Sequence, residues 1–549
     1  MDGVERQESS SVPGAGPARR RFLGLCAGVG LGAAAACEQV APAHRSAAPD
    51  ARLPEAERDR PGTADWRIGS LGAPDAIAGY ADRVSVAPGE EFGLSVSTTA
   101  AAFRVSALRV GWYGGKQARR VWFSPRIPGR AQRSPAILSG TRTVRADWPR
   151  TLTVDTTGWP EGAYLLRLEA ESGHQRYVPL ILRSTHGAGR TVLLHAPATW
   201  QAYNRWGGLS LYAGSDGSYA GRSLAVTFDR PYDQNGAEKF LVYEWAAVVL
   251  AERLGIPLAY TTGTDVHADP GVLAGATAVV CLGHDEYWTP EQRRHVTAAR
   301  DAGTNIAFLG ANTCFRRVRI EASDSGPGRT VVCYKSSYTA DPCFPARPAL
   351  VTTDFRAAPG ADPESSLTGV LYEGYPVDAP YVVTAPDHWL YEGTGVRAGA
   401  GFDHLVGVEY DRVIPGTAAP GPLEITARSP PGVRRPAQPQ RLGVLHRGRR
   451  RRGLRDRHHA LGGGPDGGHR RRQPAPRHGR GHPRLRHPHH GEPAARLRRG
   501  PGGPPPPGAT PQRRAGVRHR PGVTPARAPC GGGVRVSSGP VRSTMAACC

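Results

Sequence analysis

The segment from Gly283 to Trp288 carries the side chains best suited to chemistry: an imidazole, two carboxyl groups and two aromatic rings within six residues. The run before it, residues 276–282, is short, apolar and β-branched, as in a buried strand. Thr289, Pro290 and Gln292 then occupy the N-cap, first and third positions expected of a helix. Residues 283–288 are therefore predicted to form a strand-to-helix loop, where the sites of α/β sheets lie.

Two further loops follow predicted strands. Residues 198–212 are rich in aromatic residues and glycine, and residues 310–313 read Gly-Ala-Asn-Thr. Because the carboxyl ends of parallel strands meet at one edge of a sheet, we expect all three loops to lie together. They would bring phenols, a carboxylate, an imidazole and an amide to one place.

The elements that position these loops follow Arg190, where strands begin to alternate with helices. This order predicts a doubly wound parallel sheet, with Gly255 and Gly303 ending two of the helices. The expected strands are residues 192–195, 257–260, 276–282 and 305–309, and the expected helices are residues 239–254 and 289–302.

Before this region, residues 66–185 consist of short alternating segments punctuated by Gly and Pro, which is typical of an all-β sandwich of the immunoglobulin-like kind. The predicted class is therefore all-β plus α/β, with a sandwich domain at 66–185 and an α/β domain at 186–429. The expected sandwich strands are residues 92–97, 106–110, 151–154, 164–168 and 177–182.

The formal net charge of +23 belongs to the C-terminal tail. Residues 430–549 contain 27 Arg and 3 acidic residues, so residues 1–429 are about neutral and no nucleic-acid partner is expected. The tail consists largely of Arg, Gly, Pro and His without periodicity, and we predict it to be disordered. A polycationic arm is one explanation. We favour a frameshift in a GC-rich gene, because the composition changes abruptly after Ser429; the tail histidines are then not metal ligands.

The N-terminal residues 1–36 resemble a twin-arginine export signal, with Arg19–Leu23 followed by an apolar run rich in Gly and Ala. Either Cys37 receives a lipid after cleavage or cleavage simply follows an Ala-x-Ala sequence. Both predict an extracytoplasmic protein of the periplasm or cell envelope, tethered by a linker at 37–65, with the membrane reached only through that lipid. The twin-arginine route carries folded proteins, often with a metal in place, which hints at a metal site.

Four cysteines lie in the predicted globular part. An oxidising compartment permits a Cys333–Cys343 disulfide, and unpaired burial is the alternative. Cys281 lies inside its predicted strand, before the Gly283 turn, and so is poorly placed to act as a nucleophile.

The long motifs in and around these loops, together with Gly-Trp-Tyr-Gly-Gly in the β-rich region, resemble the family of the large subunit of N,N-dimethylformamidase. The resemblance implies a glutamine-amidotransferase-like, flavodoxin-like α/β domain without a Cys nucleophile, in which two Tyr and one Glu hold a mononuclear iron. The motifs that carry it are residues 200–212, 228–232, 283–288, 308–313 and 111–115.

Carried onto this chain, the resemblance implies Tyr203, Tyr212 and Glu286 as iron ligands, with His284 and Asn312 beside them. Phenolate and carboxylate oxygens are hard donors that suit ferric iron, and three ligands leave room for water and substrate. His284 would shuttle a proton to the leaving amine, and Asn312 would hydrogen-bond the oxyanion.

Each of these residues has a structural alternative. The two tyrosines could simply pack under a loop, Glu286 could support the following helix N-terminus, and His284 could bond to backbone. Asn312 could be a turn residue. Tyr232 and Tyr287 compete as phenols, and Glu409 is a weaker candidate for a supporting catalytic carboxylate.

The sequence thus predicts an exported, iron-dependent hydrolase of amide-type C–N bonds that acts on a small substrate, as a homo-oligomer or with a small partner subunit. The alternative is a non-catalytic envelope protein that binds a glycan or peptide through the aromatic loop at 200–212.

Overall fold

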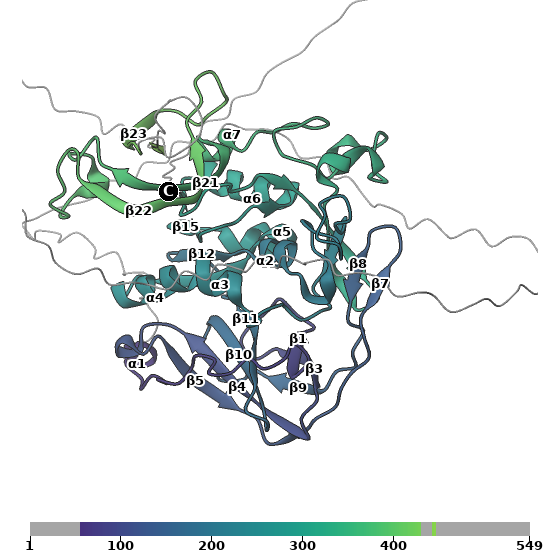
Figure 1. The fold of residues 1–549 in the computed structure, drawn as a ribbon. Helices are drawn as coiled ribbons and strands as arrows, with labels where there is room; N and C mark the ends of the chain where they lie inside the picture. The colour runs from purple at the N-terminus through teal and green to yellow at the C-terminus, as the bar shows by residue number, and fades with distance from the viewer. Residues whose placement is uncertain (1–54, 430–441, 446–549) are drawn as a thin grey trace, which may run out of the picture. The chain divides into compact units, whose positions relative to one another are not determined.

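The computed structural model describes residues 55–429 and 442–445, and this part of the chain is rich in strands with few helices (Figure 1). Strand content is 35% and helix content 18%, so the predicted combination of all-β and α/β structure is confirmed at this level. The described residues fall into two compact units, 55–296 with 307–364 and 297–306 with 365–429 and 442–445. The predicted export signal, most of the linker and nearly all of the tail lie outside the described residues.

Two packed sheets form the N-terminal part, and every strand predicted for residues 66–185 is present. The first sheet contains, in spatial order, β1 (Ile77–Ala81), β3 (Glu91–Thr98) and β9 (Leu152–Asp155). The second contains β2 (Ser85–Val86), β11 (Gln175–Leu182), β10 (Gly162–Ala170), β4 (Ala102–Val110) and β5 (Ala118–Phe123), with β6 (Ile127–Pro128) paired to β4.

The second sheet is buried on both faces. Leu166 and Leu168 of β10 belong to the core between the two sheets. Side chains alternate across a strand, so Leu165 points the other way, into a core that it shares with Phe240 and Val248. Those two residues lie on helices α3 (Glu238–Tyr243) and α4 (Trp245–Leu254), which lie next to this sheet in Figure 1. The sandwich and the α/β region therefore share one core.

A parallel sheet lies beyond these helices. Its order is β14 (Leu258–Thr262), β12 (Thr191–His195), β15 (Ala278–Cys281) and β17 (Asn305–Phe308), and the predicted strands are confirmed within three residues at each end. In chain order this is 2-1-3-4, as at the start of one common doubly wound sheet. The first strand, β12, pairs in parallel with both β14 and β15. The strand order therefore reverses between β12 and β15, although the strands stay parallel. Ligands bind at this topological switch point in such folds.

The helices follow their predicted signals with one exception. Helix α6 (Pro290–Asp301) begins as expected, because the Thr289 hydroxyl accepts the Gln292 N–H at 3.0 Å, and Gly255 adopts φ +67° after α4. The single helix predicted for residues 239–254 is wrong: it is divided into α3 and α4 at Glu244. The other helices are α1 (Glu55–Arg58), α2 (Pro197–Tyr203), α5 (Gly263–Ala268) and α7 (Ser365–Thr368).

After β17 the strand–helix alternation stops, and the described chain continues mainly as strand pairs. The predicted loop at 283–288 also ends in a short strand, β16, which pairs in parallel with β18. The strands not yet named, some of which precede β17 in the chain, form small sheets of their own. They are β7 (Ala136–Leu138) with β8 (Thr143–Arg145), β13 (Ala225–Thr227) with β20 (Gly326–Val332) and β19 (Arg319–Ser323), β16 (Tyr287–Trp288) with β18 (Arg316–Arg317), β21 (Leu371–Val382) with β22 (Gly401–Arg412), and β23 (Leu423–Ala427) with β24 (Leu442–Leu445).

All four cysteines of the described region are buried free thiols. The Cys333–Cys343 disulfide is therefore wrong: both cysteines are buried, and no disulfide joins them. Cys281 is fully buried within β15, and burial raises the pKa of its thiol well above the usual range, so it has neither the access nor the thiolate character of a nucleophile. Within residues 55–429 and 442–445, no helix has the length and apolar character needed to cross a membrane.

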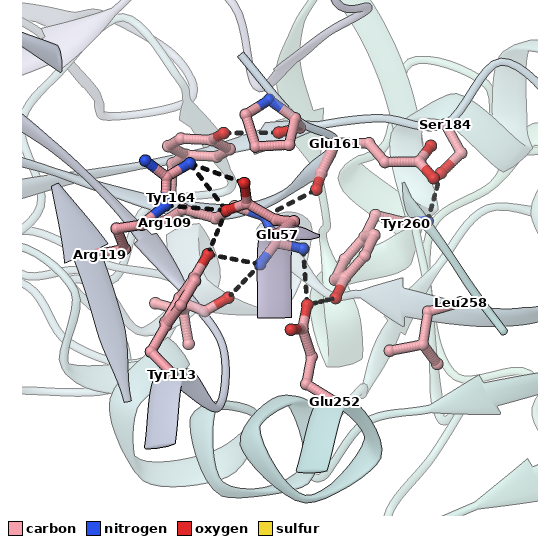
Figure 2. Close-up of polar contacts among 12 residues, drawn as sticks. Glu57, Arg109, Tyr113, Arg119, Glu161, Tyr164, Ser184, Glu252, Leu258 and Tyr260 are labelled. Carbon is pink, nitrogen blue, oxygen red and sulfur yellow. Dashed lines mark hydrogen bonds and ion pairs between the residues drawn. The ribbon is translucent and has the colours of Figure 1, made fainter. Parts of the chain in front are cut away.

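A buried ion pair ties the sandwich to helix α4 (Figure 2). Arg109 of β4 donates to Glu252 of α4 at 2.6 Å, and both side chains are fully buried. The same guanidinium donates to the Tyr113 hydroxyl at 2.8 Å, and Glu252 also accepts from Tyr260 of β14 at 2.6 Å. The charges are thus paired and hydrogen-bonded, which is the condition for burying them.

We predict that Arg109→Met destabilises the protein by about 3–5 kcal/mol, because the substitution leaves the Glu252 charge buried without its partner. Urea unfolding followed by circular dichroism measures the effect. Arg126→Met is the matched control, since Arg126 and Glu171 form an exposed pair and its loss should leave the unfolding midpoint unchanged. Equal midpoints for the two variants would contradict the structural role of the Arg109–Glu252 pair.

Candidate functional site

Three loops meet at the carboxyl edge of the parallel sheet, as predicted. The Thr199 hydroxyl on α2 accepts the backbone N–H of Glu286 at 3.1 Å, and the Arg316 N–H donates to the Glu286 carbonyl at 2.8 Å. Gly283 and Gly310 are in backbone contact: a Cβ on Gly310 would lie 2.0 Å from the Gly283 carbonyl oxygen. Only glycine permits that approach, so the second and third loops close against each other there.

Two phenols converge on one carboxylate at this edge. The hydroxyls of Tyr203 and Tyr212 each lie 2.7 Å from Glu286 Oε2, and they lie 2.9 Å from each other. The two rings stack with centroids 4.4 Å apart. Tyr203 is the last residue of α2 and Glu286 directly precedes β16, so the switch point between β12 and β15 brings them together.

Cationic side chains surround this cluster. His284 Nε2 lies 2.9 Å from the Tyr203 hydroxyl and 3.4 Å from Glu286 Oε2. Arg316 donates from Nε to Glu286 Oε1 at 3.1 Å. Lys335 is fully buried, with Nζ 3.4 Å from the centroid of the Tyr212 ring. The carboxylate therefore sits in a positive environment that favours its ionised form.

The pKa of Glu286 reflects this environment. Burial raises the pKa of its carboxyl group, but the hydrogen bond from His284 and the charges of His284 and Arg316 outweigh burial and bring the pKa to about 2. Burial, followed by the charge of Glu286, raises the pKa of both Tyr203 and Tyr212 well above the usual range. In the structure the phenols are thus protonated and the carboxylate is ionised.

The remaining candidates fall in different places. Asn312 is buried in the third loop, with a left-handed φ of +61°. Tyr287 packs edge-on against the rings of Tyr203 and Tyr212, whereas Tyr232 packs against Trp200. Glu409 lies on β22, in the other unit, so its supporting role stays a prediction.

Sequence reasoning missed three residues of the site. Arg316 follows the third loop closely and could have been found by extending that loop into β18. Thr199 lay inside the first loop but carries no catalytic signal of its own. Lys335 lies about fifty residues beyond Glu286 in the sequence, and no motif marks it.

The donor set fits a hard cation. The three oxygen atoms of Tyr203, Tyr212 and Glu286 lie within 2.9 Å of one another, so a single cation that displaces the two phenol protons would contact all three. Such binding releases protons and becomes stronger as pH rises. Among the described residues, no group of three His, Cys, Asp or Glu side chains is arranged to hold a metal ion. A site built on two phenols uses a different donor set.

Fold and site together define a sheet-rich protein with a buried phenol–carboxylate cluster at the switch point of a parallel sheet. The chain belongs to the N,N-dimethylformamidase beta subunit-like family. The C-terminal domain that defines this family matches residues 104–460 of the chain, which is more than half of it. The match runs past Ser429, after which the frameshift is predicted, and the frameshift stays a prediction.

Other comparisons add little. No curated protein has significant sequence similarity to this chain. A solved structure of a cycloisomaltooligosaccharide glucanotransferase from Paenibacillus sp., bound to cycloisomaltoheptaose, is 11% identical over 22% of this chain, with a TM-score of 0.14. This chain spans only 15% of that protein, and a score so low carries no argument about fold or function.

We predict that Glu286 remains ionised at pH 4, below the ordinary carboxyl pKa near 4.5. A depressed pKa means that the carboxylate stabilises the fold above pH 4.5 and that this contribution is lost as pH falls toward 2. The infrared difference spectrum of wild type minus Glu286→Gln at pH 4 should contain a carboxylate band. A protonated carboxyl band in its place would show that the surrounding cations do not control this group.

Proposed function

We propose that this protein is a metal-dependent hydrolase of amide-type C–N bonds, with Tyr203, Tyr212 and Glu286 as ligands of a mononuclear iron. The observation that carries the proposal is the convergence of two partly buried phenols on one buried carboxylate. Membership of the N,N-dimethylformamidase beta subunit-like family supports a hydrolase-like role.

When bound, the cation would polarise an amide carbonyl and lower the pKa of a bound water. The protein supplies the rest. His284, within hydrogen-bond reach of Tyr203, is placed to move a proton between the attacking water and the leaving amine. Asn312, buried in the adjoining loop, would hydrogen-bond the oxygen on which charge develops. Arg316 and Lys335 favour the ionised form of Glu286 by their charge.

We propose further that the sandwich is immunoglobulin-like and that the α/β region is glutamine-amidotransferase-like. The 2-1-3-4 strand order supports the second assignment. Export by the twin-arginine route, followed either by attachment of a lipid to Cys37 or by plain cleavage after an Ala-x-Ala sequence, completes the proposal. Both rest on the N-terminal sequence alone.

The first test is the metal content and visible spectrum of the full chain. Wild type should contain about one iron per chain and show a phenolate charge-transfer band, and Tyr203→Phe, Tyr212→Phe and Glu286→Gln should each lose most of both. Tyr232→Phe is the matched control, because Tyr232 is partly buried against Trp200 and should leave the band intact. A folded wild-type protein without metal would refute the iron site and favour the glycan- or peptide-binding alternative.

The second test is hydrolysis of a panel of small linear amides by iron-loaded protein. His284→Gln should lower kcat by about 10²–10⁴-fold, since a positioned proton-transfer group contributes that much, while iron content stays unchanged. Activity that survives in His284→Gln would remove the proton-shuttle role. Iron-loaded wild type that hydrolyses none of the amides would place the substrate outside this class.

A further inference from the structure

Glu244 is a fully buried carboxylate at the break between α3 and α4. Oε2 lies 2.6 Å from His195 Nδ1, at the end of β12. Oε1 accepts the indole N–H of Trp200 at 2.7 Å and the backbone N–H of Ala196 at 3.2 Å. One carboxylate is thus bound by three donors from the short stretch where β12 passes into α2.

Helix α2 needs such a partner. It has only seven residues, and its N-cap residue, Ala196, has no side chain that could cap it. Short helices are marginal on their own and depend on tertiary contacts. Glu244 holds the residue before the helix and Trp200 within it, one turn before Tyr203.

The same contacts explain the helix break. At Glu244 the backbone leaves helical geometry, with φ −120° and ψ −37°, and the side chain reaches the β12–α2 corner. A continuous helix over 239–254, which the sequence predicts, would have to place this residue in regular helical geometry. The helix is thus interrupted at the residue whose carboxylate accepts hydrogen bonds from the β12–α2 corner. That corner leads into α2, which ends at Tyr203, a predicted iron ligand.

We propose that Glu244 is a positioning residue for Tyr203: it anchors the start of α2 so that the Tyr203 oxygen stays on Glu286. This inference rests on the proposed function for its role in metal binding. The anchoring itself rests on the three hydrogen bonds and holds with or without a metal.

The test compares Glu244→Leu with Glu244→Gln in the full chain. Leucine leaves three buried donors without an acceptor, and we expect iron affinity to fall about 10–100-fold, as for other groups that orient metal ligands, with a weakened or shifted phenolate band. Glutamine keeps an amide oxygen for Trp200 and Ala196, and its amide can donate to His195 in the other tautomer. We expect Glu244→Gln to restore most of the affinity.

Glu252→Leu is the matched control, because it removes an equally buried carboxylate eight residues further along the chain, in α4. That carboxylate binds Arg109 instead of the start of α2. It should lower stability without changing the band. A folded Glu244→Leu with wild-type affinity and spectrum would overturn the proposal, and so would an equal spectral change in Glu252→Leu. If Glu244→Leu does not fold, Trp200→Phe removes a single donor and should give a smaller change of the same kind.

A metal-free readout separates the two proposals. In Glu244→Leu the amide hydrogens of residues 198–203 should exchange at least tenfold faster, and a crystal structure should show the Tyr203 oxygen moved from its 2.7 Å contact with Glu286. If wild type binds no iron, the proposed function fails, and these measurements still decide the anchoring. Unchanged exchange and an unchanged contact would overturn it.

Discussion

The Glu286 carboxylate imposes the constraint on which the site depends: a charge buried to this degree must be neutralised and hydrogen-bonded. Its oxygens receive two phenol hydroxyls and Arg316, with His284 close by. The two tyrosines come from the first loop and Arg316 follows the third, so these segments must close on the second loop before the charge can be buried. The glycine contact between the second and third loops and the Thr199 hydroxyl under the second make that closure possible. The burial of this charge therefore already brings together the three oxygen atoms that a cation would bind.

The helices α3 and α4 connect this site to the sandwich. Glu244, at the break between them, binds the corner that carries α2, and Glu252, near the end of α4, binds Arg109 of the sandwich. Phe240 of α3 and Val248 of α4 pack in the core that also contains Leu165 of β10. The sandwich is therefore part of the scaffold of the site, and this explains why one compact unit includes both.

The phenols set this site apart from a cysteine hydrolase on a similar sheet. Cys281 ends β15 but is buried with a raised pKa, whereas the loop that follows it carries the carboxylate. Burial and the charge of Glu286 keep the tyrosines protonated. Lys335, beside the Tyr212 ring, and Arg316, bonded to Glu286, are positive charges close to the phenols if these lose their protons. Family membership supports a hydrolase-like role, and the proposed iron site rests on the three oxygen atoms that a hard cation would bind.

Local patterns in the sequence determined five strands of the sandwich, the four strands of the parallel sheet, the N-cap at Thr289 and the loop that presents His284 and Glu286, because alternation, capping and strand ends act over a few residues. The resemblance to a family supplied Tyr203 and Tyr212. Tertiary structure alone decided the rest. The helix predicted for 239–254 breaks at Glu244 because distant donors capture that side chain. Arg316 and Lys335 reach the site only after the chain folds back, and no disulfide joins Cys333 and Cys343. Contacts between residues far apart in the chain have no periodicity that a sequence could display.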